Sequence, residues 1–342
     1  LMKNLNLWNK FVFLINSVFA LLLLVGYLLP YYPPKIFPPI AVLTLIIPVL
    51  IAVNLAFAVY WLLLFKRQML LSILVLGLWM LHNTTLYKIE SGTLPAELET
   101  SEDQISLLTY NAHVFRSESF SRDTIQAGNE ALVSQANPDI VCYQEFSNHG
   151  APDLNYPYHY FGVNANTRSS IQAIYSKYKI INQGSLDFES TFNNAIFVDI
   201  VKKQDTLRIY NMHMQSLALT PELGALEQEN TKSLVGRLGR AFKKQEDQVE
   251  LFLEHQAACP YKKIVAGDFN NTVFSYTYNK IKGEKTDAFA EQGSGFGRTF
   301  IFDIIPLRID FILSDPEFKV RAFENFDVTY SDHFPIMAVL EL

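Results

Sequence analysis

The sequence predicts an α/β domain that follows an apolar helical anchor. Three windows near the N-terminus contain no Asp, Glu, Lys or Arg, while the chain from residue 105 onward shows short apolar runs bounded by turn residues. Such runs are typical of buried strands. A chain of 342 residues is also long for a single domain. We therefore expect a membrane anchor over residues 1–89, an acidic linker over 90–104 and an α/β domain over 105–342.

The uncharged windows cover 24, 30 and 20 residues, at 11–34, 36–65 and 68–87. A membrane-spanning helix needs roughly 20 apolar residues, so the first two windows are long enough, whereas the third ends in a polar run. A signal peptide is the alternative interpretation of the first window, but the two further apolar windows argue against it. We expect about three transmembrane helices: one over 10–29, one within 40–65 with a kink at Pro48, and one over 69–87.

Positive charges near the helix ends predict the orientation. The N-terminal side carries Lys3, Lys10, Lys66 and Arg67, and the opposite side carries Lys35 and Lys88. Because cytoplasmic ends carry an excess of Lys and Arg, the N-terminus is expected in the cytoplasm. Three spans would place the α/β domain outside the cytoplasm, and two spans would leave it inside. We expect a multi-pass membrane protein with an extracytoplasmic α/β domain.

The remainder of the chain is acidic. Six of the 28 Lys and Arg residues and three of the 34 Asp and Glu residues precede residue 100, which leaves 22 positive and 31 negative charges and a net charge of −9. Proteins that bind long nucleic acids usually present basic surfaces, so a nucleic-acid partner is possible but not favoured. Cys142 and Cys259 are interpreted as buried free thiols, with a disulfide between them as the alternative.

Polar side chains follow several of the predicted strands. Two helical stretches, about 124–136 and within 225–258, separate these strands. Groups placed just past the ends of buried strands can converge on one rim of a sheet, as in a metal-assisted phosphoryl-transfer site. The segments are Tyr110-Asn111, Gln144-Glu145, Asn211-Met212-His213, Gly267-Asp268-Phe269-Asn270, Arg308-Ile309-Asp310 and Ser331-Asp332-His333.

Three of these segments suggest specific chemistry. Asp268 and Asn270, two apart on an extended chain, would project to one side and could orient a water molecule and hold a phosphate oxygen. Glu145 is a reasonable magnesium ligand, because magnesium keeps several waters and needs few protein oxygens. His333 could act as a general base or bind a phosphoryl oxygen, with Asp310 as the acid that orients it. Taken singly, each segment could equally be an ordinary turn.

As a set, the segments resemble the endonuclease–exonuclease–phosphatase superfamily, and the resemblance covers residues 105–342. It departs from the usual pattern at Lys179 and Val273, where proline is common in relatives. The matching stretches are Leu108-Thr-Tyr-Asn111, Pro138-Asp-Ile-Val-Cys-Tyr-Gln-Glu145, Ala173-Ile-Tyr-Ser-Lys-Tyr178, Tyr210-Asn-Met-His213, Gly267-Asp-Phe-Asn270, Arg308-Ile-Asp-Phe-Ile312 and Ser331-Asp-His-Phe-Pro335.

The resemblance implies a four-layer α/β sandwich of two packed β-sheets flanked by helices, and magnesium-dependent hydrolysis of a phosphoester, with manganese as a substitute. On the metal side it implies three residues: Glu145 as a ligand, Asn111 in its shell and Asp332 in support. On the catalytic side it implies Asp268 to position or deprotonate water, Asn270 to hold the phosphate, His213 to stabilise developing charge, and Asp310 with His333 as an orienting pair.

These observations predict a membrane-anchored, monomeric, metal-dependent phosphodiesterase or phosphatase. Its partners would be a phosphoester substrate, such as a lipid headgroup or a small phosphoester, and the lipid bilayer. A metal-dependent endonuclease or exonuclease is the alternative enzyme, and a non-catalytic membrane interaction module is the alternative from another class. Substrate choice is expected to reside in loops such as 147–155 and 217–228.

Overall fold

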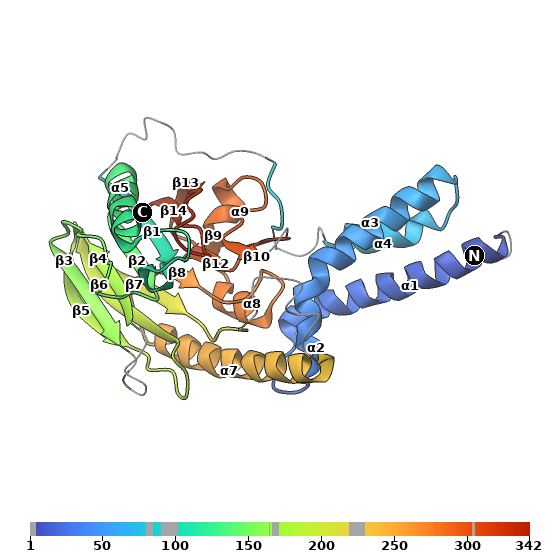
Figure 1. The fold of residues 1–342 in the computed structure, drawn as a ribbon, viewed down its shortest axis with the longest axis horizontal. Helices are drawn as coiled ribbons and strands as arrows, with labels where there is room; N and C mark the ends of the chain where they lie inside the picture. The colour runs from blue at the N-terminus through green and yellow to red at the C-terminus, as the bar shows by residue number, and fades with distance from the viewer. Residues whose placement is uncertain are drawn as a thin grey trace.

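The computed structural model describes residues 5–79, 85–89, 102–163, 165, 171–218, 230–302 and 305–342. These residues form a helical N-terminal region and a larger α/β region built on two sheets (Figure 1). In Figure 1 the blue N-terminal helices project together to one side of the sheets.

The N-terminal region contains more pieces than expected. Pro38 opens one short helix, and Pro48 lies in the first turn of another, where its missing N–H leaves no helical hydrogen bond unmade. The expected helix within 40–65 corresponds to one helical run, Pro38–Leu63, whose 3₁₀ stretch Val42–Ile46 ends just before Pro48, where the kink was expected. The helices are α1 (Leu7–Leu28), the 3₁₀ helix η1 (Leu29–Tyr31), α2 (Pro38–Ala41), the 3₁₀ helix η2 (Val42–Ile46), α3 (Ile47–Leu63) and α4 (Met69–Trp79).

The third apolar window also differs from the expectation. Residues 80–84 lie outside the described part, but residues 85–89 are not helical. Instead, Lys88 exchanges backbone hydrogen bonds of 2.8 and 2.9 Å with Gly295. A helix reaching residue 87 is therefore wrong, because the chain there already pairs with the α/β region. Within the described chain, two stretches, Leu7–Tyr31 and Pro38–Leu63, are long and apolar enough to cross a membrane.

Buried polar groups link the three long N-terminal helices. Nδ2 of Asn16 donates to Oγ of Ser72 at 2.8 Å, and Nε1 of Trp61 donates to Oδ1 of Asn16 at 3.0 Å. All three side chains are buried. In an apolar environment such bonds hold helices together, because no water competes for them.

The described residues of the α/β region form two six-stranded sheets and a short hairpin. The first sheet has the order β13 (Lys319–Asn325), β14 (Ile336–Glu341), β1 (Gln104–Asn111), β2 (Ile140–Gln144), β4 (Ile171–Ser176) and β3 (Tyr158–Val163). The second has the order β5 (Lys179–Ser185), β6 (Asn194–Lys202), β7 (Asp205–His213), β8 (Lys262–Asp268), β12 (Asp310–Ser314) and β9 (Thr286–Asp287). The hairpin pairs β10 (Phe300–Phe302) with β11 (Ile305–Leu307). Of the expected linker, residues 90–101 lie outside the described part, and Gln104 already belongs to β1.

The two sheets pack face to face through apolar side chains such as Ile140, Ile209 and Ile264. The first sheet is covered on its outer face by α5, where Val133 packs with Val141. The second is covered by α7 and α8. The expected four-layer α/β sandwich is therefore confirmed, and both cysteines are buried and free. The remaining helices are η3 (His113–Phe115), α5 (Arg122–Ala136), α7 (Thr231–Ala257), α8 (Tyr276–Lys282) and α9 (Ala288–Gln292).

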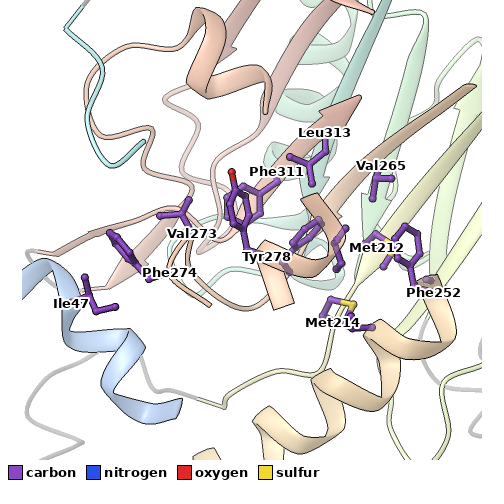
Figure 2. Close-up of a cluster of buried hydrophobic side chains, with 14 of the residues drawn as sticks. Ile47, Met212, Met214, Phe252, Val265, Val273, Phe274, Tyr278, Phe311 and Leu313 are labelled. Atoms are coloured by element: carbon purple, nitrogen blue, oxygen red, sulfur yellow. The ribbon is translucent and has the colours of Figure 1, made fainter. Parts of the chain in front are cut away.

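The N-terminal region and the sandwich share one apolar core. Ile47 of α3 belongs to the same buried cluster as Phe274, Phe311 and Phe252 of the sandwich (Figure 2). A polar contact supports the junction, because the backbone N–H of Lys35 donates to a carboxylate oxygen on α7 at 2.6 Å. The N-terminal region is therefore packed against the α/β region through both apolar and polar contacts.

Candidate active site

The polar residues singled out in the sequence meet at one edge of the sandwich. β1 and β2 are parallel neighbours in the first sheet, and β7 and β8 are parallel neighbours in the second. β12 runs antiparallel to β8, so that Asp310 pairs with Asp268 at this edge. The residues gathered there are Asn111, Glu145, His213, Asp268, Asn270, Asp310, Asp332 and His333.

Asp268 lies at the centre of this group. Its side chain is 1% exposed, and its Oδ2 accepts hydrogen bonds from Nδ2 of Asn111 at 3.0 Å and from Nδ2 of Asn270 at 2.9 Å. Its Oδ1 accepts from the backbone N–H of Asn270 at 2.7 Å. The imidazoles of His213 and His333 each place Nε2 at 3.8 Å from Oδ2. Amides on one side and imidazoles on the other therefore fix this carboxylate.

The backbone around Asp268 requires special conformations. Gly267 has a φ of +132°, and a Cβ there would lie 2.1 Å from the carbonyl oxygen of Met212. Asn270 has a φ of +49°, in the left-handed region that Asn tolerates better than most residues. The expectation that Asp268 and Asn270 lie side by side on extended chain is wrong, since a turn brings the two side chains together.

His333 forms the expected pair with Asp310. Nδ1 of His333 lies 2.9 Å from Oδ2 of Asp310, and both side chains are buried. Burial alone would lower the pKa of His333, but the carboxylates of Asp310 and Asp268 outweigh it and raise that pKa to about 10. Burial, followed by the negative charge of Asp310, raises the pKa of Asp268 to about 8. The cluster therefore holds its protons more tightly than exposed groups would.

His213 ends β7 on the other side of Asp268. Its Nε2 lies 3.7 Å from Oε1 of Glu145 and 2.9 Å from Nδ2 of Asn193. Among the described residues, its buried Nδ1 has no hydrogen-bond partner. Burial lowers the pKa of His213, with a smaller opposing effect from Glu145. This imidazole is therefore held in its neutral form near pH 7.

Glu145 and Asp332 form the more accessible side of the site. Their side chains are 35% and 33% exposed, and Oε2 of Glu145 and Oδ1 of Asp332 lie 3.9 and 3.4 Å from Nδ1 of His113. Asn111 contacts Glu145 through its Nδ2, 3.4 Å from Oε1. Carboxylate and amide oxygens are the ligands that magnesium prefers. This donor set therefore fits a divalent cation.

A second group of possible ligand atoms comprises Asp268, Asp310 and His333, whose ligand atoms lie within 4.8 Å of one another. In this group the two ring nitrogens of His333 face the two carboxylates, one at 2.9 Å and the other at 3.8 Å. A protonated imidazole between two carboxylates satisfies that geometry without a metal. We therefore interpret the group as an orienting pair next to Asp268.

Asn193 and His113 belong to the site but were not singled out from the sequence. Asn193 contacts His213, and His113 faces Glu145 and Asp332. Ser331, which the Ser-Asp-His motif does include, donates its hydroxyl to the carbonyl oxygen of Asn111 at 2.8 Å. No motif named in the sequence contains Asn193 or His113.

A buried amide network beneath the site joins the two sheets. Nδ2 of Asn211 donates to the carbonyl of Tyr143, and Nε2 of Gln144 donates to Oδ1 of Asn211 at 2.7 Å. Gln172 donates to the carbonyl of Asn211 at 3.0 Å. Because Asn211 lies on β7 and its partners lie on β2 and β4, the network sets the spacing of the two sheets under the site.

The site opens into a cleft of about 180 Å³. Its polar wall includes Asn111, Glu145, Asp268 and His333, and its remaining walls are largely apolar. A neighbouring pocket of about 570 Å³ shares Glu145 and His213 with the site and adds Phe192. A substrate could therefore extend from the carboxylates in two directions.

Comparison with solved structures shows the same fold in other proteins. An endonuclease/exonuclease/phosphatase from Bacteroides vulgatus is similar with a TM-score of 0.54 and 17% identity, over 70% of this chain and 99% of that chain. The D. rerio TDP2 structure complexed with single strand DNA product gives 0.53 and 14%, over 70% and 99%. The human Nocturnin catalytic domain with bound sulfate anion gives 0.50 and 15%, over 70% and 94%. At these identities the likeness shows the fold alone.

Two family profiles match the sequence, whereas no curated protein does. A domain of unknown function (DUF8431) matches residues 9–85. The profile described as the endonuclease/exonuclease/phosphatase family matches residues 108–333, which is more than half of the chain and includes every one of the eight site residues. The chain therefore belongs to the endonuclease/exonuclease/phosphatase family of hydrolases, whose members are metal-dependent phosphoesterases and nucleases.

Proposed function

We propose that this chain hydrolyses phosphoester bonds with the help of magnesium, or of manganese in its place. The observation that carries the proposal is the position of Asp268. Its buried carboxylate lies between His213 and His333, at 3.8 Å from each, and next to the oxygen donors of Glu145 and Asp332. This places a proton acceptor, two imidazoles and hard-oxygen ligands around one cleft, which is what hydrolysis of a phosphoester requires.

Glu145, Asp332 and Asn111 would hold the cation. When bound, it would stabilise negative charge on the phosphate oxygens, as divalent cations do in phosphoryl transfer. The position of the two carboxylates supports this assignment. They come from different loops, yet both lie close to one imidazole, that of His113, and so could bind one cation together.

The remaining residues would act on water and on the leaving group. In its ionised form, which is populated as the pH approaches its raised pKa of about 8, Asp268 would orient the attacking water and accept its proton, and Asn111 and Asn270 would fix its position. His333, which Asp310 orients, would hold its proton beside the carboxylate of Asp268. His213 would face the charge that develops at phosphorus or on the leaving oxygen.

The structure supports a narrower role for Asn270 than the sequence suggested. Its Nδ2 donates to the carbonyl of Met214 at 3.0 Å and to Asp268 at 2.9 Å. Both amide hydrogens are therefore engaged. Asn270 would position Asp268, and it would bind a phosphate oxygen only by exchanging one of these two bonds.

A nuclease is the second candidate function. The D. rerio TDP2 structure with a DNA product has the same fold, but no Lys or Arg lines the described part of the central cleft. Nucleic acids bind chiefly through their phosphates to basic groups. Small or lipid phosphoesters are therefore the favoured substrates.

We also propose that α1 and α3 cross a membrane, that the apolar segment beginning with α4 crosses it a third time, and that the α/β region therefore lies outside the cytoplasm. Lys10, Lys66 and Arg67 belong to the end of the helices remote from the sheets, and Lys35 contacts α7 at the near end. A tag fused after Leu342 should be digested by protease added to intact cells with an opened outer envelope. Protection of the tag until the membrane is lysed would contradict this orientation.

A substrate panel tests the proposed activity. The full chain in detergent micelles would be given a phosphomonoester, a chromogenic phosphodiester, single-stranded DNA and a glycerophospholipid, each with magnesium and with manganese. We expect cation-dependent hydrolysis of at least one small or lipid ester. Failure to turn over any of the four by a protein with a cooperative melting transition would refute the proposal, and cleavage of DNA alone would support the nuclease.

A further inference from the structure

One wall of the central cleft comes from the N-terminal region. Leu45 of η2 lines the same cleft as Asp268 and His333, although more than 200 residues separate it from either in the sequence. Five other apolar residues line the same cleft: Leu217, Ala218, Phe300, Leu307 and Ile309. The cleft therefore combines polar groups that suit a phosphate with apolar side chains that suit hydrocarbon.

The position of Leu45 is fixed by packing. Leu45 contacts the small cluster of Ala41, Leu238 and Phe242, which joins α2 to α7. Lys35, shortly before α2, donates its backbone N–H to Glu246 and its Nζ to other carboxylates on α7. The segment from Lys35 to Leu45 is therefore docked on α7 at both ends, by polar contacts at Lys35 and by apolar contacts at Ala41 and Leu45.

The apolar wall continues onto the helices that have membrane-crossing length. Ile46 and Val49, which follow Leu45, are 44% and 48% exposed, and Phe37 is 55% exposed. Exposed apolar side chains of this kind continue along α1 and α3. A hydrocarbon chain lying against this surface would reach the cleft without crossing water.

We propose that Leu45 and Leu307, which line the same cleft, form an apolar subsite for the hydrocarbon part of a membrane-resident phosphoester, a lipid whose phosphate is hydrolysed at Asp268. This inference rests on the proposed function and names its substrate class. Hydrolysis consumes one water: its oxygen joins phosphorus, the phosphorus–oxygen bond to the leaving alcohol breaks, one of the water's two protons ends on that alcohol, and the other stays on the new P–OH group or passes to solvent. The apolar subsite excludes water from the tail and orients the headgroup toward the carboxylates.

A matched pair of chromogenic esters isolates the subsite. p-Nitrophenyl ethyl phosphate and p-nitrophenyl hexadecyl phosphate release the same leaving group and differ only in the alkyl chain. The full chain in phosphatidylcholine vesicles with magnesium should favour the hexadecyl ester. Leu45→Gln should lower kcat/KM for that ester by about 10-fold, mainly through KM, because a half-buried leucine side chain contributes about this much to binding hydrocarbon. It should leave the ethyl ester unchanged.

Ile181→Gln is the control, since Ile181 is an exposed apolar residue on β5 that does not line the cleft. It should leave the turnover of both esters unchanged. Leu307→Gln tests the second apolar residue of the subsite and should reproduce the selective loss, which keeps the test open if Leu45→Gln does not fold. Equal turnover of the two esters by the parent chain, or an equal loss on both esters in the Leu45 and Leu307 variants, would overturn the subsite. Absence of turnover on both esters by a folded parent chain would instead refute the phosphodiesterase activity on which the subsite rests.

Discussion

The imidazole of His333 bridges two buried carboxylates. Its Nδ1 lies 2.9 Å from Asp310 and its Nε2 lies 3.8 Å from Asp268. Asp310 begins β12 and Asp268 ends the neighbouring strand β8, so the two acids face the ring from adjacent strand ends. An imidazole held in this way keeps one nitrogen engaged and presents the other to the reacting groups.

Substituting His333→Ala should lower turnover by about 10²-fold or more, as is typical for acid–base groups. The fold should survive, because the residue lies in a turn before β14 and not between the sheets. His159→Ala, at an exposed histidine on β3, is the control and should keep the parental rate. A lower melting temperature of the His333 variant, together with full activity of the protein that remains folded, would contradict this prediction. It would show that His333 only holds the terminal strand in place.

Substituting Glu145→Gln should raise the magnesium concentration needed for half-maximal activity, because an amide is a weaker ligand than a carboxylate. A second readout is thermal stabilisation by magnesium, which follows from binding to the folded state alone. The parent chain should gain melting temperature with added magnesium and the variant should gain less. Equal magnesium dependence of the two proteins would remove Glu145 from the cation site.

Substituting Gly267→Ala should destabilise the protein by about 2 kcal/mol or more, since a Cβ there meets the backbone of Met212 and the φ is positive. Gly236→Ala within α7 is the matched control. Its nearest atom is the end of the Arg240 side chain at 3.6 Å, so it should be neutral or stabilising by about 0.5–1 kcal/mol. Urea unfolding of the two variants checks this, and similar midpoints would contradict the account of the turn.

The burial of His255 predicts how the stability of the fold changes with pH. Burial, followed by the positive charge of Arg208, lowers the pKa of His255 below its usual 6.5. Below that usual value the unfolded chain takes up a proton that the folded chain resists, so this contribution to stability is present above about pH 6.5 and is lost as the pH falls. His255→Gln should therefore lose less melting temperature than the parent chain between about pH 8 and about pH 5.5. Identical losses would show that His255 does not couple folding to pH.

The sequence predicted those parts of the site that depend on local order. Asn111, Glu145, His213 and Asp268 each end or follow a strand, and strand ends can be read from apolar runs and the turn residues after them. The four-layer arrangement was expected only from the resemblance of the motif set to a known superfamily, because apolar runs do not reveal how the sheets pack.

The sequence did not reveal, or predicted wrongly, features that depend on contacts between residues far apart in the chain. Leu45 lines the cleft only because α2 docks on α7, and nothing in its neighbours along the chain indicates this. Residues 85–87 follow an apolar helix, but the pairing of Lys88 with Gly295 favours extended chain there. Asn270 was placed on extended chain, because periodicity does not reveal a single left-handed residue.

The most direct test of the central claim is the rate at which the full chain releases p-nitrophenol from bis(p-nitrophenyl) phosphate. The parent chain should be active with magnesium, should lose that activity in excess chelator, and should regain it when magnesium is restored. Asp268→Asn should retain the fold and lose about 10²-fold or more of the rate with magnesium present. Undiminished turnover in chelator, or a parental rate from Asp268→Asn, would contradict the assignment of this cluster as a metal-dependent phosphoesterase site.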